Sequence, residues 1–98
     1  MKAIADLCLI PLGVGTSLAP YIAECQRVLA QSGLKHEMHA YGTVIEGDFD
    51  AVTQVIKTCH KAVHGMDCPR ITSTIKIGTR TDRDQSIEDK IEAVNELL

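Results

Sequence analysis

One carboxylate inside an apolar run is the residue of this chain best placed to do chemistry. The stretch YGTVIEGDF, residues 41–49, puts Glu46 directly after Ile45 and directly before Gly47. A carboxylate taken out of water must be paired or hydrogen-bonded, or its pKa shifts. Two interpretations stay open. Either Glu46 pairs with Arg80 or a lysine at a strand end, or it accepts a hydrogen bond from an N–H of a bound ligand.

Arg80 and Asp82 form a second candidate group, in the segment GTRTDRDQS. Mixed charges after a strand are typical of a solvated loop with local ion pairs. An arginine at that place can instead bind a carboxylate or a phosphate through two parallel hydrogen bonds. Both interpretations stay open, and the loop GVGTS, residues 13–17, adds a helix N-terminus suited to anions. An enzyme acting on a phosphate or acyl substrate has only these two features in its favour.

The histidines and cysteines indicate neither a metal site nor a catalytic site. His60 and His64 have the i, i+4 spacing of a metal pair, but no nearby residue completes a ligand set. The four cysteines show no C-x-x-C spacing. No Ser-His-Asp or Cys-His arrangement follows from the spacing. We therefore expect a protein that is not an enzyme and that holds no metal and no cofactor.

Hydrophobic periodicity and turn residues predict the elements that position these groups. Residues 2–12 form an apolar run, typical of a buried strand. In order, we then expect a helix capped by Thr16 or Ser17 and ending at Gly33, a hairpin of strands 34–40 and 43–47, a helix capped by Gly47 or Asp48, a strand within 70–80, and a helix opened by the capping box Ser86–Asp89.

This order, β-α-β-β-α-β with an extra C-terminal helix, predicts an α+β protein with the ferredoxin-like fold. Right-handed crossovers place the first two helices on one face of an antiparallel sheet, with the first and third strands in its centre. The first strand is apolar on both faces. The face without helices is therefore expected to pack against the sheet of another subunit. At 98 residues we expect a single domain, residues 1–98.

Composition excludes several classes of protein. The formal net charge is −3 and aromatic residues make up 3% of the chain, so we expect no nucleic-acid binding. No apolar run approaches the roughly 20 residues of a membrane span, so we expect no membrane partner. The apolar N-terminus is interpreted as a strand and not as a signal peptide. Cysteines on apolar helix faces favour a reducing cytoplasm.

Four motifs that span most of the chain carry a resemblance to a known family. They are IPLGVGTS (10–17), GTVIEG (42–47), PRITSTIKIGTRTD (69–82) and DKIEAV (89–94). The chain resembles the thiamine-binding-protein-like family of small ferredoxin-like proteins, with fungal members as the closest match. The resemblance implies sheet-packed dimers that join into tetramers, and in some relatives the binding of thiamine or its hydroxymethylpyrimidine moiety. It implies ligand-binding roles for Thr43, Ile45, Glu46, Arg80 and Asp82.

Two functions from different classes follow. The first is a cytoplasmic, non-enzymatic protein that binds thiamine, its pyrimidine moiety or a similar small heterocycle as a homo-oligomer, a dimer of dimers. The alternative is a structural or regulatory oligomer with no small ligand, in which Glu46 forms an ion pair at an interface. Regular pleating turns Thr43 to the sheet face opposite Glu46. A ligand that touches both side chains would need a bulge in the strand.

Overall fold

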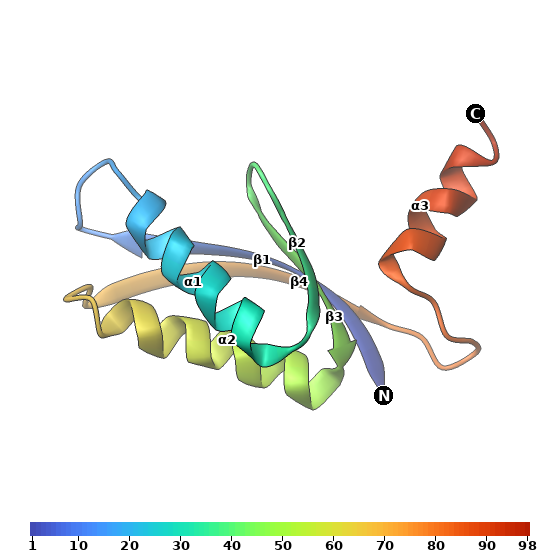
Figure 1. The fold of residues 1–98 in the computed structure, drawn as a ribbon, viewed down its shortest axis with the longest axis horizontal. Helices are drawn as coiled ribbons and strands as arrows, with labels where there is room; N and C mark the ends of the chain where they lie inside the picture. Colours follow the sequence, from blue (N-terminus) through green and yellow to red (C-terminus); the bar gives the residue numbers. More distant parts are fainter.

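The computed structural model describes residues 1–98 and contains four strands and three helices. In chain order they are β1 (Lys2–Leu12), α1 (Ala19–Ser32), β2 (Lys35–His39), β3 (Gly42–Asp48), α2 (Phe49–His64), β4 (Arg70–Thr79) and α3 (Ile87–Asn95). Helices α1 and α2 lie side by side over one face of the sheet, while α3 projects from the far end of the molecule (Figure 1). The predicted order of elements is confirmed.

The sheet has the strand order β2-β3-β1-β4, and all neighbouring strands are antiparallel. β1 and β3 are therefore central, as predicted, and the fold is ferredoxin-like. In the register, Ala5 lies opposite Ile45 on β3 and opposite Ile77 on β4. Side chains alternate between the two faces. Ala5, Leu7 and Leu9 thus point toward the helices.

We call the other side of the sheet the open face, because α1 and α2 do not cover it. Its central positions are Ile4, Asp6, Cys8 and Ile10 on β1 and Val44 and Glu46 on β3. The apolar residues among them are half-buried or exposed, and Asp6 is exposed. The open face is therefore an apolar strip interrupted by charges.

Two of the three helices begin where local sequence places them. Asp48 caps α2 by accepting a hydrogen bond from the Asp50 N–H, and Ser86 caps α3 in a reciprocal capping box with Asp89. The prediction for α1 was wrong. Its N-cap is Leu18, whose carbonyl accepts the first helical hydrogen bonds and whose side chain provides no cap.

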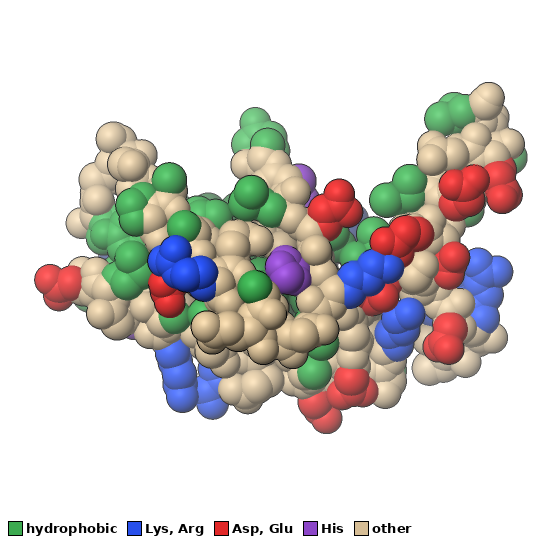
Figure 2. Space-filling model, in the orientation of Figure 1, with side chains coloured by type: hydrophobic (Ala, Val, Ile, Leu, Met, Phe, Trp, Pro, Cys, Tyr) green, Lys and Arg blue, Asp and Glu red, His purple; other side chains and the backbone are tan.

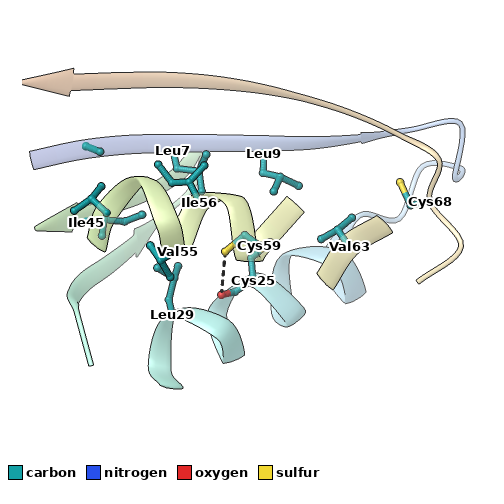
Figure 3. Close-up of a cluster of buried hydrophobic side chains, with 12 residues drawn as sticks. Leu7, Leu9, Cys25, Leu29, Ile45, Val55, Ile56, Cys59, Val63 and Cys68 are labelled. Atoms are coloured by element: carbon teal, nitrogen blue, oxygen red, sulfur yellow. Dashed lines mark hydrogen bonds between the residues drawn. The ribbon is translucent and has the colours of Figure 1, made fainter. Parts of the chain in front are cut away.

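The core lies between the sheet and the two packed helices (Figure 3). Ile45, Leu29 and Cys59 are fully buried there. Cys25 and Cys59 face each other from α1 and α2 as free thiols, and the Cys59 thiol donates to the Cys25 carbonyl at 3.9 Å. The neighbouring Cys25 thiol and burial both raise the pKa of Cys59, so this cysteine stays protonated and unreactive.

Two apolar stripes, one on β4 and one on α3, stay largely uncovered within the chain. Ile75 and Ile77 share the helix side of β4, yet they are 43% and 37% exposed because the helices leave this part of the edge strand uncovered. On α3 only Ile87 is buried, and Ile91 and Val94 are 54% and 58% exposed. None of the three helices is long and apolar enough to cross a membrane.

Candidate functional site

A pocket of about 280 Å³ lies between α1, β1 and the turn that joins β2 to β3. We call it the apolar pocket, because ten of its fourteen lining residues are hydrophobic. It exists because α1 packs mainly on α2 and leaves space above the sheet at this end. Leu7 and Leu9 of β1 and Ile22 of α1 contribute to its walls.

Two polar side chains of the apolar pocket form a hydrogen bond with each other. The Gln26 Nε2 donates to the Thr43 Oγ1 at 2.8 Å, across the gap between α1 and β3. Thr43 is 5% exposed, so its hydroxyl is protected from bulk water. The bond uses one donor of the amide and one acceptor of the hydroxyl. The Gln26 carbonyl oxygen and the Thr43 hydroxyl proton remain for a ligand.

Glu46 lies on the opposite side of the sheet, where it anchors α3. Its Oε1 accepts a hydrogen bond from the backbone N–H of Ile87 at 2.6 Å. Its Oε2 lies 3.7 Å from the Lys2 Nζ and 3.9 Å from the Lys35 Nζ. The side chain is only 10% exposed. A carboxylate at a helix N-terminus is favoured both by the free N–H groups and by the helix dipole.

Lys35, which lies close to Glu46, also forms a salt bridge with Glu88 in the first turn of α3. The bond to Glu88 raises the pKa of Lys35, and the same bond lowers the pKa of Glu88. Both groups are therefore charged at neutral pH. The base of α3 is thus held to the sheet by Glu46, by Lys35 and by the buried side chain of Ile87.

Arg80 and Asp82 pair with each other directly after β4. The Arg80 guanidinium donates to the two carboxylate oxygens of Asp82 at 2.7 and 2.5 Å, and to the Gln85 Oε1 at 3.1 Å. The Arg80 guanidinium lowers the pKa of Asp82 to about 2. The carboxylate of Asp82 is occupied by this pairing, and the guanidinium is held in a fixed orientation.

The five residues predicted for one ligand site are distributed over three places. Thr43 lines the apolar pocket, and Ile45 is fully buried in the core behind it. Glu46 is at the base of α3, and Arg80 with Asp82 lies in the loop after β4. Of the two interpretations of Glu46, the structure shows pairing, with two lysines and a backbone N–H, and not with Arg80.

Sequence reasoning missed Gln26, the partner of Thr43. A glutamine beside the apolar stripe of a helix is usually solvated, and only the fold brings α1 over β3. Its position next to Cys25, at the edge of the buried stripe, was the one available signal.

The two helical histidines are used locally. His60 Nε2 lies 2.6 Å from the Ser73 Oγ, and His64 Nδ1 lies 2.7 Å from the Cys68 carbonyl oxygen. Burial, with a smaller effect of His64, lowers the pKa of His60, so its ring is neutral at pH 7. No group of three or more metal-ligating side chains occurs in the chain.

Sequence comparison connects the chain to proteins of all three domains of life. A UPF0045 protein of the cyanobacterium Synechocystis is 56% identical over 98 residues, which cover 100% of this chain and 81% of that protein. The UPF0045 protein ECM15 of the fungus Eremothecium gossypii is 34% identical, over 100% and 94% of the two chains. The expectation that fungal members match best is therefore wrong.

Solved structures share the fold. A hypothetical protein of Methanocaldococcus jannaschii has a TM-score of 0.89 at 38% identity and covers 97% of both chains. A Thermotoga maritima protein, described as a candidate thiamine biosynthesis/salvage protein, has a TM-score of 0.83 at 18% identity, over 96% and 99% of the two chains. At that identity the likeness concerns the fold alone.

The family model described as "Thiamine-binding protein" matches residues 5–95, which include most of β1, both pocket residues Gln26 and Thr43, and Glu46. With this match and the 56% identical relative, the chain belongs to the thiamine-binding protein family.

Proposed function

We propose that the protein binds a small aminopyrimidine, either free hydroxymethylpyrimidine or the corresponding half of thiamine, in the apolar pocket, and that it is not an enzyme. The observation that carries the proposal is the bond of 2.8 Å between the Gln26 amide and the Thr43 hydroxyl in an otherwise apolar wall. The family match supports this ligand class.

The free groups of this pair complement the edge of an aminopyrimidine. The Gln26 carbonyl oxygen accepts from the exocyclic amine, while the Thr43 hydroxyl donates to the adjacent ring nitrogen. The apolar walls cover the two faces of the ring. Such a division, with mostly apolar walls and few directional polar groups, is usual for small-molecule sites.

Pocket size favours the pyrimidine half over the whole vitamin. The volume of about 280 Å³ is just below the range of about 300–1,000 Å³ that is usual for ligand pockets. A single substituted ring fits within it. The thiazolium ring of thiamine would then extend past the β2–β3 turn, where Tyr41 is 85% exposed.

We propose that the protein acts as a homo-oligomer, assembled through the open face and α3. At the end of the open face away from α3, Cys8 and Ile10 of β1 are not covered by the helices, and a two-fold axis would pack them against the same residues of a second copy. The exposed Ile91 and Val94 of α3 offer a second apolar contact. Two separate contacts of this kind produce a dimer of dimers.

Calorimetric titration with hydroxymethylpyrimidine and with thiamine tests the ligand. We expect binding by the natural chain and at least tenfold weaker binding by Thr43→Val, which keeps the shape but removes the hydroxyl. Thr53→Val, on the exposed side of α2, is the matched control and should bind normally. Absence of heat at millimolar ligand would refute the proposal. Loss of binding in Glu46→Gln would instead locate the ligand on the open face.

A structural or regulatory oligomer without a ligand is the second candidate. The observation in its favour is that Glu46 is already partnered within the chain, at the base of the element that would join subunits. Calorimetric titration and sedimentation analysis together test this candidate. It predicts no heat with thiamine or hydroxymethylpyrimidine in the natural chain, and weaker assembly in Glu46→Gln.

A further inference from the structure

A larger cavity of about 490 Å³ lies at the other end of the sheet, between the open face, the end of β4 and the loop that leads to α3. We call it the basic cavity. Its charged lining residues are five cations and a single acid: Lys2, Lys76, Arg80, Arg83, Lys90 and Asp6. The proposed pyrimidine site is elsewhere and uses none of these residues.

The lining of the cavity is mainly positively charged, although the whole chain has a negative formal net charge. The protein has 10 Lys and Arg against 13 Asp and Glu, yet half of the bases and only one of the acids line this cavity. That acid, Asp6, is already bonded to the His39 ring at 2.7 Å. Lys76, Arg83 and Lys90 form no salt bridge within the chain.

Acidic side chains do lie near the cavity, but each has its own partner. Figure 2 shows charged side chains of both signs gathered where the sheet meets α3. Asp82 is bonded to Arg80, Glu88 to Lys35, and Asp89 to the Ser86 backbone N–H. None of these three acids lines the cavity. The field inside it is therefore set by the cations.

The floor of the basic cavity has a gap in its side chains. Gly78 lies opposite Ile4 in the register, and a Cβ built on Gly78 would meet no atom within 4 Å. A glycine inside a strand weakens the strand and often marks a place where a ligand approaches the backbone. Ile4 and Val44 provide apolar surface beside this gap.

We propose that the basic cavity binds a small phosphorylated organic molecule. The phosphate is held by Lys76, Arg83 and Arg80, whose guanidinium is oriented by Asp82 and Gln85. The organic part lies over Gly78 against the apolar floor, because the volume is much larger than an inorganic phosphate requires. Cations that converge on a cavity from the sheet, a loop and a helix favour a compact anion over an extended polyanion.

Titration with ribose 5-phosphate and with inorganic phosphate tests the proposal, because neither probe contains a pyrimidine. We expect ribose 5-phosphate to bind more tightly than inorganic phosphate, and Lys76→Gln and Arg83→Gln each to weaken it about tenfold or more. Lys57→Gln, an exposed lysine on α2 outside the cavity, is the matched control and should bind normally.

Two results would overturn the proposal: no binding of either probe at millimolar concentration, or equal weakening by Lys57→Gln and Lys76→Gln, which would indicate non-specific attraction only. Gly78→Val provides an independent test. Because nothing obstructs the new side chain, we expect a folded protein with an unchanged or higher melting temperature that no longer binds ribose 5-phosphate. Retained binding in this variant would refute the placement over Gly78.

Discussion

Removal of the Glu46 carboxylate should release α3 from the sheet while the rest of the fold stays intact. In Glu46→Ala the buried end of α3 loses the acceptor of the Ile87 N–H, a bond of 2.6 Å to a charged oxygen. Hydrogen bonds to charged groups contribute about 1.5–3 kcal/mol. The lysine contacts at 3.7 and 3.9 Å add less than about 1 kcal/mol, because both lysines are partly exposed.

The loss should be local. A helix of nine residues is marginal by itself, so α3 depends on its attachment to stay ordered. We expect the amides of α3 to exchange with deuterium roughly ten- to a hundredfold faster in Glu46→Ala, as about 1.5–3 kcal/mol implies. The amides of β1 and β3 should keep their protection. Glu46→Gln keeps an acceptor oxygen and should give a smaller increase.

Glu24→Ala is the matched control for this prediction, since it removes an equally large carboxylate that pairs only with Arg27 on α1. It should leave exchange in α3 unchanged. If Glu46→Ala also leaves it unchanged, the bond to Ile87 does not hold the helix, and the structural explanation of Glu46 is refuted.

Three further predictions concern other positions. Gly42→Ala should destabilise the protein by about 1–3 kcal/mol in urea unfolding, because a Cβ there would overlap the backbone carbonyl of Leu7. Gly33→Ala should cost about 1 kcal/mol in the same assay, because this helix C-cap has a φ of 74°. NMR titration should find Asp82 ionising with a pKa of about 2, and Arg80→Gln should return it toward the ordinary value of about 3.9. Its lowered folded-state pKa means that the contribution of this pair to stability is present above about pH 4 and is lost as the pH falls toward 2.

The helices and strands could be predicted because sequence features within a few residues of one another determine them. The apolar run of residues 2–12 is bounded by its own turn residues, and β1 covers the same range. The Ser86–Asp89 capping box requires only a spacing of three residues, and it forms as predicted. The central position of β1 and β3 follows from the handedness of the crossovers, which constrains topology more strongly than any single residue does.

The contacts that define the candidate sites depend on residues far apart in the chain. Glu46 and Ile87 are 41 residues apart, and Gln26 and Thr43 are 17 apart. No local pattern relates the members of either pair. The error at the start of α1 has a different cause. Thr16 and Ser17 are good capping residues, but the helix begins later, with Leu18 as its cap and Pro20 in its first turn.

The motif GTVIEG shows why one continuous stretch of sequence need not correspond to one site. Side chains alternate along β3, so Thr43 and Ile45 point to the helices while Val44 and Glu46 point to the open face. Thr43 therefore lines the apolar pocket, and Ile45 belongs to the core. Glu46 has a reason to be a carboxylate that requires no ligand, since it satisfies the first N–H of α3. Variants of Thr43 and of Glu46 should consequently change different properties of the protein, ligand binding in the first case and the attachment of α3 in the second.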